Sequence, residues 1–449
     1  MQLWQPAIPD SYHAMSEADL DAAITKRKKE LGSDLVVLGH HYQTDEVIQH
    51  ADFTGDSFKL SQLAAEQVGK VGAKYVIFCG VHFMAETADI LTDDGVAVML
   101  PDLGAGCSMA DMADYEQTVE AWDAIHAALN RSGRVAERPS GQVEEENAAS
   151  DHSATGPLDH SATSYRVIPI CYMNCTAAIK AFCGEHGGAV CTSSNCEKVF
   201  DWALQGGDTP LADGEQVKIL FLPDQHLGRN TAAQAGFDPV TQMCLWDPKA
   251  GDGLGGVIER AGGGLEGAGG DGDSGAGEQG LIDSTFILWK GHCSVHKLFR
   301  PEHVDQIRAQ WPDVTVMAHP ECSYEVCQKA DLTGSTEGII QALANAEEGS
   351  KWAIATEVHL VKRICDEAET RGITARILSD CQCLCTTMYR IDRPHLLWIM
   401  DNLAEGKVIN QISVHPEATR QSLLSLNRML EITGAPSLNE GGVAAGLVD

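Results

Sequence analysis

Three cysteines in separate segments of the chain could share one metal centre. Cys107 lies in LPDLGAGCSMADM, Cys293 in LWKGHCSVHKLF and Cys385 in CQCLCTTMYRI, and each follows an apolar run at a turn of small and polar residues. Structural zinc sites and ferredoxins more often take their ligands from local clusters such as CxxC. Three thiolates that only the fold can bring together favour a metal or iron–sulfur centre with one open position, and an open position favours catalysis.

Polar side chains gather where predicted strands end, which is the edge of a parallel sheet where ligands bind. These groups are His40, His41 and Tyr42; Asp56 and Ser57; Tyr172 and Asn174; Thr192 to Asn195; His296; His319 and Glu321; and Ser335 and Thr336. Each has a structural alternative, because a histidine can satisfy a backbone group and a serine or threonine can cap the next helix. Together with three candidate thiolate ligands, these groups indicate an active site.

Short apolar runs without alternation predict the strands that position these residues, because a strand buried on both faces has this pattern. The runs are 35–39, 75–80, 96–102, 166–172, 218–224, 286–289, 314–319 and 352–356. Helical spacing lies between them, as in 58–69, which we expect to end at Gly69, and in 422–432. Alternating strands and helices predict an α/β fold with parallel sheets covered on both faces.

A weak internal echo indicates a repeated α/β unit in three copies. Segments 99–106 and 221–228 share the order strand, Leu-Pro-Asp and Gly-containing turn. The turns 79–87, 171–179 and 318–326 also come after strands. Chance similarity among strand-to-helix turns is the alternative.

Composition narrows the function classes. A chain of 449 residues suggests roughly two to four domains. Its net charge of −32 disfavours nucleic-acid binding, because the protein would repel phosphates. With no apolar run of about 18 residues and no secretory signal, we expect no membrane span and a cytosolic location. Most of the 15 cysteines are then expected to be core residues rather than a disulfide framework.

Two stretches, 138–164 and 249–280, are polar or rich in Gly and Asp, and we predict that both are disordered insertions. Neither can bury enough apolar surface to offset the entropy lost on ordering. The second stretch lacks GxxxxGK[ST] and follows no strong strand, so it is not predicted to bind phosphate.

At this point the chain resembles the quinolinate synthase family, the iron–sulfur quinolinate synthetase A proteins. The matching segments cover most of residues 35–390 and are GHHYQTDEVIQHADFTGDS, VIFCGVHFMAETADIL, LPDLGAGCSMADM, YMNCTAAIKA, CTSSNCEKV, FLPDQHLGRN, GHCSVH, AHPECSYEV, GSTEGII and CLCTTM. The chain departs from the family pattern in its two insertions, in the residue between His and Tyr in GHHYQ, and in its CxCxC run.

The resemblance implies three similar α/β/α units with short parallel sheets around a pseudo-threefold axis, and an active site at their junction. The expected organisation is an N-terminal extension, three units and a flexible tail. The boundaries are 1–24; 25–115; 116–290, with disordered insertions at 138–164 and 249–280; 291–437, with the C-terminal helices; and 438–449.

The resemblance also implies a cofactor and a reaction. One cysteine from each unit, Cys107, Cys293 and Cys385, would hold a [4Fe–4S] cluster, although Cys381 and Cys383 lie close to the third. The family enzyme is a transferase of NAD biosynthesis. It condenses iminoaspartate with dihydroxyacetone phosphate to quinolinate, releasing phosphate and two waters, and the open iron acts as a Lewis acid. An aspartate oxidase is the implied source of iminoaspartate.

The family roles fall on two sets of residues. Proton transfer falls to His40, Tyr42, His319 and Glu321, and our hypothesis for the general base is Glu321, while the division of acid and base roles among the four stays open. The implied substrate-binding set is His40, Ser57, Tyr172, Asn174, Ser193, His296, His319, Glu321, Ser335 and Thr336. Two other classes stay open: an iron–sulfur sensor or electron carrier, which would need none of these side chains, and a zinc hydrolase with mixed Cys and His ligands.

Overall fold

The computed structural model describes residues 5–93, 95–132, 134–135, 164–249, 257–260, 277–380 and 383–435. The predicted insertion 138–164 and the tail 438–449 lie outside these residues, apart from Ser164. The predicted insertion 249–280 contains strand β10 (Val257–Arg260) and the start of helix α10 (Gly277–Asp283), and most of its other residues are outside the description. Within the described ranges, no helix combines the length and the apolarity that a bilayer crossing needs.

One arrangement of four parallel strands occurs three times, in the order second, first, third, fourth along each sheet. Unit 1 consists of β2 (Phe53–Gly55), β1 (Leu35–His40), β3 (Tyr75–Cys79) and β4 (Ala97–Met99). Unit 2 consists of β7 (Ala189–Cys191), β6 (Ser164–Tyr172), β8 (Glu215–Leu222) and β11 (Phe286–Trp289). Unit 3 consists of β13 (Leu332–Thr333), β12 (Val314–Ala318), β14 (Lys351–Ala355) and β15 (Thr374–Ile377).

Additional strands extend the first two sheets. In unit 2, β9 (Met243–Asp247) joins β11, β10 pairs antiparallel with β9, and β5 (Arg134–Val135) pairs with the start of β6. In unit 1, β16 (Gln411–Ile412) from the far end of the chain pairs antiparallel with β4. These additions lie at sheet edges or at the start of a strand, so the four-strand arrangement is kept.

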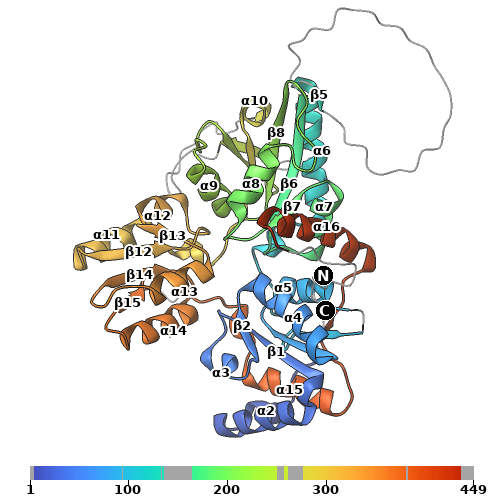
Figure 1. Ribbon diagram of the computed structural model, residues 1–449, viewed down its shortest axis with the longest axis vertical. Helices are drawn as coiled ribbons and strands as arrows, with labels where there is room; N and C mark the ends of the chain where they lie inside the picture. Colours follow the sequence, from blue (N-terminus) through green and yellow to red (C-terminus); the bar gives the residue numbers. More distant parts are fainter. Residues whose placement is uncertain are drawn as a thin grey trace, which may run out of the picture.

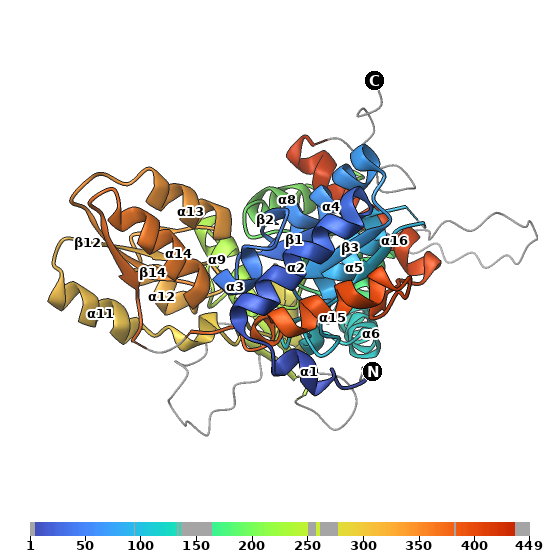
Figure 2. The same cartoon turned by 90° about the horizontal axis from the view of Figure 1, so that it is seen from below.

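Helices follow the strands and cover the sheets, and the three units form separate lobes that meet at the centre of the molecule (Figure 1; Figure 2). The helices of unit 1 and the N-terminus are α1 (Asp10–His13), α2 (Glu17–Leu31), η1 (Gly32–Asp34), α3 (Asp45–Ile48), α4 (Ser57–Val71), α5 (His82–Leu91) and η2 (Ala110–Met112). Those of unit 2 are α6 (Tyr115–Ser132), α7 (Ala177–Glu185), α8 (Cys196–Leu204), α9 (Gln225–Gln234) and α10. The remainder are η3 (His296–Leu298), α11 (Pro301–Gln310), α12 (Tyr324–Lys329), α13 (Thr336–Ala344), α14 (Val358–Glu369), η4 (Met388–Arg390), α15 (Arg393–Ala404) and α16 (Pro416–Thr433).

The apolar runs form the strands they predict, and the α/β fold class of three parallel units is confirmed. All six residues of β1 are buried, as expected for a strand with helices on both faces. The predicted helix end at Gly69 is wrong. Helix α4 continues to Val71 and ends at Gly72, whose φ of 70° is the left-handed conformation that a glycine adopts without steric cost.

The C-terminal segment returns to the first two units. Helix α15 packs against α2, and α16 packs against α7. Helix α16 lies between the lobes of units 1 and 2, and α15 lies beside α2 (Figure 1). Ser422 and Ser425 of α16 are buried and donate hydrogen bonds to the carbonyls of Ala177 and Lys180. The chain therefore ties its first two lobes together, while the limits of each unit along the sequence stay a prediction.

The loops after the fourth strands make equivalent backbone hydrogen bonds in the three units. Two residues before each cysteine, a carbonyl accepts from the first residue of the helix after the third strand: Ala105 from His82 at 2.9 Å, Gly291 from Gln225 at 3.0 Å, and Cys383 from Val358 at 3.1 Å. Each cysteine carbonyl then accepts the N–H four residues later, at 3.0, 3.1 and 3.0 Å for Cys107, Cys293 and Cys385. A short 3₁₀ turn begins three residues after each cysteine. Cys107, Cys293 and Cys385 thus occupy one equivalent position in the three units.

Candidate active site

One cavity of about 80 Å³ has all three of these cysteines in its wall. Burial raises the pKa of the Cys107 thiol to about 12 and raises the pKa values of Cys293 and Cys385 as well. The thiols are close enough that each negative charge would raise the pKa of a neighbour. Backbone N–H groups act in the opposite direction, from Ala110, His296 and Met388, each three residues after its cysteine. A metal would replace the protons that burial keeps on these sulfurs.

Two side chains at the end of the first strand of each unit line this cavity. One belongs to the last residue of the strand or to the residue after it, and the other comes two positions later. They are His40 and Tyr42 after β1, Tyr172 and Asn174 after β6, and His319 and Glu321 after β12. Because these strands are parallel and occupy the same place in their sheets, the fold brings together six side chains that are far apart in sequence. This pairing of residues i and i+2 was visible in the sequence.

Two of these residues are histidines held in the same tautomer. His40 Nδ1 accepts the Tyr42 N–H at 3.1 Å, and His319 Nδ1 accepts the Glu321 N–H at 3.3 Å. Burial lowers the pKa of His40 well below its usual value and lowers the pKa of His319 to about 3. Both rings are therefore neutral at pH 7 and carry their proton on Nε2, where they can donate to a ligand.

Glu321 is a buried carboxylate that is kept ionised. Burial opposes ionisation, but the neighbouring His296 and a hydrogen bond from Tyr172 outweigh it, and the pKa of Glu321 falls to about 2. His296 Nδ1 lies 2.8 Å from Glu321 Oε2, and the His296 and His319 rings stack with centroids 4.4 Å apart. The carboxylate is thus a strong hydrogen-bond acceptor in a site with little water.

Thr356, which sequence reasoning missed, links the polar groups of units 1 and 3. Its hydroxyl lies 3.1 Å from Tyr42 Oη and 3.2 Å from His296 Nε2, and it is fully buried. Tyr42 Oη also lies 3.4 Å from Thr336 Oγ1. Thr356 follows β14 directly, so the end of the run 352–356 was the signal that could have identified it.

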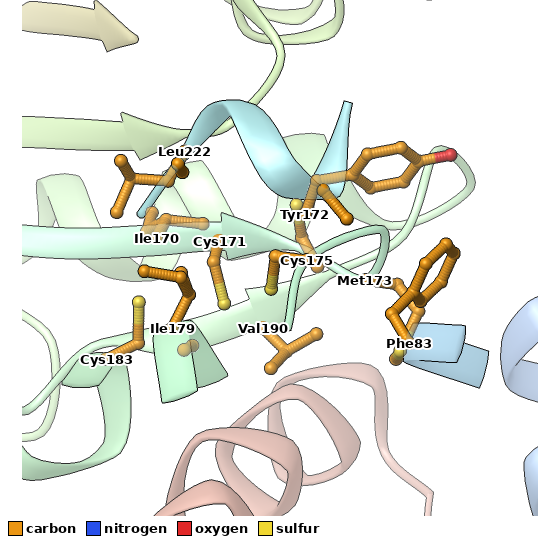
Figure 3. Packing of buried hydrophobic residues seen from close by; sticks show 14 of the residues in the cluster. Phe83, Ile170, Cys171, Tyr172, Met173, Cys175, Ile179, Cys183, Val190 and Leu222 are labelled. Atoms are coloured by element: carbon orange, nitrogen blue, oxygen red, sulfur yellow. The ribbon is translucent and has the colours of Figure 1, made fainter. Parts of the chain in front are cut away.

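Tyr172 extends from the end of β6 toward the cavity, away from the buried thiols of Cys171, Cys175 and Cys183 (Figure 3). Burial and the charge of Glu321 raise the pKa of Tyr172 well above its usual value, so its hydroxyl keeps its proton. Ser193 contacts the same hydroxyl. All three thiols are buried, and burial raises the pKa values of Cys171 and Cys175, which supports the prediction that most cysteines are core residues.

The ends of the second strands supply hydroxyl groups next to helix starts. Ser57, Ser193 and Thr336 line the cavity, as do Asp56 and Thr192. Ser335 does not: its hydroxyl caps α13 by accepting the Gly338 N–H at 3.2 Å. The capping alternative therefore holds for Ser335, and it also holds for Asp56, which caps α4.

Two further predicted residues lie beside the cavity rather than in its wall. His296 reaches it through Glu321. The backbone carbonyl of His41 accepts a hydrogen bond from Arg363 of α14, which also binds the Gln43 carbonyl at 2.8 Å. Arg363 thus fixes the loop that carries Tyr42 to unit 3. The apolar part of the wall was not predicted and includes Phe83, Met109, Met173, Val295 and Met388.

A mixed ligand set also exists here. Among the described residues, one group could hold a single metal ion through side-chain atoms within 4.8 Å of one another, namely Cys293, His296 and Glu321. The three cysteine sulfurs do not form such a compact group, which fits a multi-iron cluster, where each thiolate binds a different iron. Both arrangements use Cys293. A single ion would add His296 and Glu321, whereas a cluster would add Cys107 and Cys385.

Comparisons with known proteins identify the family of the chain. The family model described as quinolinate synthetase A protein matches residues 22–431. Quinolinate synthase of Acidobacterium capsulatum is 46% identical over 425 residues, covering 95% of this chain and 96% of the relative. The proteins of that name from Anoxybacillus flavithermus and Rhodopirellula baltica are each 42% identical, covering 96% and 94% of this chain and 98% and 93% of their own lengths. The chain therefore belongs to the quinolinate synthase family.

Proposed function

We propose that this chain condenses iminoaspartate with dihydroxyacetone phosphate to form quinolinate for NAD biosynthesis, with release of phosphate and two waters. The observation that carries this proposal is the meeting of three equivalent cysteines with acid, base and hydroxyl side chains from all three units in one cavity. A redox carrier would have no use for these side chains.

Cys107, Cys293 and Cys385 are the proposed ligands of a [4Fe–4S] cluster. Cys385, rather than Cys381 or Cys383, occupies the position equivalent to the other two, and Cys383 is fully buried in the core of unit 3. Within the described part of the cavity wall there is no fourth cysteine. When bound, the cluster would supply a Lewis-acidic iron that helps a hydroxyl group leave.

The substrates are anions, and the proposed binding groups match them. Tyr172 and Asn174 are placed to orient a carboxylate through a protonated hydroxyl and an amide. Ser57 and Thr336 are the first residues of α4 and α13, where backbone N–H groups favour phosphate or carboxylate oxygens. Ser193 adds a hydroxyl, and Ser335 contributes by capping α13 rather than by direct contact.

Proton transfer is assigned to His40, Tyr42, His319 and Glu321. The two histidines donate through Nε2–H, and Tyr42 donates through a hydroxyl kept protonated by burial. Glu321 is the proposed general base, held by His296. Its low pKa makes it a weak base in the free protein, but substrate carboxylates next to it would raise that pKa, and basicity would appear when the substrates bind.

The proposal extends to supply and location. Iminoaspartate would come from an aspartate oxidase, and the enzyme would work in the cytosol, where its thiols stay reduced. The source of iminoaspartate follows from the family resemblance.

A mixed-ligand zinc enzyme is the second candidate, because Cys293, His296 and Glu321 could bind one ion. Anaerobic reconstitution with iron and sulfide, metal analysis and an assay with both substrates separate the candidates. The quinolinate synthase proposal requires that the reconstituted protein hold about four irons and four sulfides per chain. It also requires that this protein convert the two substrates to quinolinate. Stoichiometric zinc without iron or sulfide would contradict the iron–sulfur proposal.

A further inference from the structure

The residue that caps the helix after the third strand is equivalent in the three units but differs in chemistry. It is Val81 before α5, Asp224 before α9 and Glu357 before α14. In each case the next residue donates the hydrogen bond that fixes the cysteine loop. Val81 makes no side-chain cap, whereas both carboxyl groups do.

Asp224 caps α9 with one oxygen and lies beside the cysteine loop of its unit, where its backbone forms a parallel bridge with Gly291. Oδ1 accepts the N–H groups of His226 and Leu227 at 2.7 and 2.8 Å. The backbone N–H of Cys293 acts on the same carboxyl and lowers its pKa, against the larger effect of burial, which raises it. Oδ2 is buried without a hydrogen-bond partner in the described structure, and the side chain is fully buried.

Glu357, at the equivalent position of unit 3, uses both of its carboxyl oxygens. Oε2 accepts the N–H groups of His359 and Leu360 at 2.7 and 3.2 Å. Oε1 accepts the Cys385 N–H at 3.5 Å and lies 3.0 Å from His359 Nδ1. This side chain is also fully buried. A buried carboxyl is costly to desolvate, so two of them at equivalent positions need a reason.

We propose that Asp224 and Glu357 are positioning residues that hold the loops of Cys293 and Cys385 in the conformation that binds the cluster. This inference rests on the proposed cluster ligands. Unit 1 has Val81 at this position, and its loop is held from within, since Asp102 Oδ1 accepts the Gly104 N–H at 2.7 Å. The two carboxyl groups thus couple the starts of α9 and α14 to the cluster ligands, and Cys107 has no such coupling.

The first test is hydrogen exchange in the cluster-free protein, measured by mass spectrometry under anaerobic conditions. Asp224→Asn keeps an oxygen for the helix but offers a donor to the Cys293 N–H. We expect faster exchange in a peptide spanning 290–297. Glu357→Gln should accelerate exchange in a peptide spanning 383–389 about five-fold or more, the effect of losing the one hydrogen bond between Glu357 and the Cys385 N–H. Asp224→Ser keeps one capping oxygen and separates loss of the cysteine contact from loss of the helix cap.

The second test uses the reconstituted holoprotein and reads iron content and the electron paramagnetic resonance spectrum of the reduced cluster. Asp224→Asn and Glu357→Gln should lower the bound iron per chain and alter the spectrum. Asp392→Asn is the matched control, because Asp392 also caps a helix, α15, and its carboxyl bonds to His395 rather than to the N–H of a cysteine.

The outcomes separate the two proposals. If the wild type assembles a cluster but both carboxyl variants match it in exchange and spectrum, the positioning role is wrong. Faster exchange with an unchanged spectrum would also overturn it, since the carboxyl groups would then serve only the fold. If the wild type itself binds no cluster, the proposed function fails, and unchanged exchange in the cluster-free variants would overturn the positioning role independently.

Discussion

The ends of the fourth strands and the ends of the first strands follow the same threefold arrangement but use it in opposite ways. The fourth-strand loops present the same residue three times, Cys107, Cys293 and Cys385, with matching backbone hydrogen bonds. The first strands present three different pairs, from His40, Tyr172 and His319 onward. One set of positions suits a symmetric ligand set, and the other suits substrates that have no symmetry.

The largest effect on the protein should come from replacing any one of the three equivalent cysteines. Replacing Cys107, Cys293 or Cys385 by Ala should each reduce iron and sulfide in the anaerobically reconstituted protein by about ten-fold or more, because the cluster loses one of three thiolates. Cys381→Ala and Cys365→Ala should keep most of the cluster. Equal iron content in the Cys385 and Cys381 variants would show that the equivalence in unit 3 does not define the ligand.

The next largest effect should come from a residue at the end of a first strand, where the three units differ. Glu321→Gln is isosteric but cannot take a proton, so kcat should fall by about 10²- to 10⁴-fold while cluster content stays near that of the wild type. Glu325→Gln, on the nearby helix α12, is the control and should retain activity. Loss of the cluster together with activity would instead place Glu321 among the metal ligands, as the group of Cys293, His296 and Glu321 allows.

A smaller effect is expected from the link between units 1 and 3. Tyr42→Phe removes the hydroxyl that contacts Thr356 and Thr336, and we expect kcat to fall about 10²-fold. Thr356→Val keeps the shape and removes the contact to both Tyr42 and His296, so it should lower kcat less. Full activity of Tyr42→Phe would remove Tyr42 from proton transfer.

The smallest effect concerns acid stability. The pKa of His319 is lowered by burial from 6.5 to about 3, so the unfolded chain binds this proton first and stability falls as the pH drops from about 6.5 toward 3. His319→Asn should therefore show a shallower loss of unfolding free energy over that range in urea titrations. His13→Asn, at an exposed position, serves as the control. A slope unchanged by His319→Asn would mean that the histidine is not buried in its neutral form.

The sequence predicted the long strands and the cysteine trio well, because continuous apolar runs and turns with cysteine are local signals. It did not predict β2, β7 or β13, which have only two or three residues and no clear pattern. The proposed echo between 99–106 and 221–228 is wrong in register. The first segment follows a fourth strand and the second follows a third strand, so their shared Leu-Pro-Asp is not a threefold feature.

Other features depend on contacts that no local pattern reveals. The pairing of β16 with β4 joins residues more than 300 positions apart, and Thr356 gains its role only through Tyr42 and His296. The cap formed by Ser335 could be predicted as an alternative but could not be separated from substrate binding.

We propose that Cys107, Cys293 and Cys385 would hold a [4Fe–4S] cluster with one iron left free to bind a ligand. Mössbauer spectra of the ⁵⁷Fe-reconstituted protein, with and without quinolinate, test it most directly. We predict that quinolinate changes the signal of one iron in four and leaves the other three unchanged. Four unchanged irons, or a protein that takes up no iron, would contradict the account.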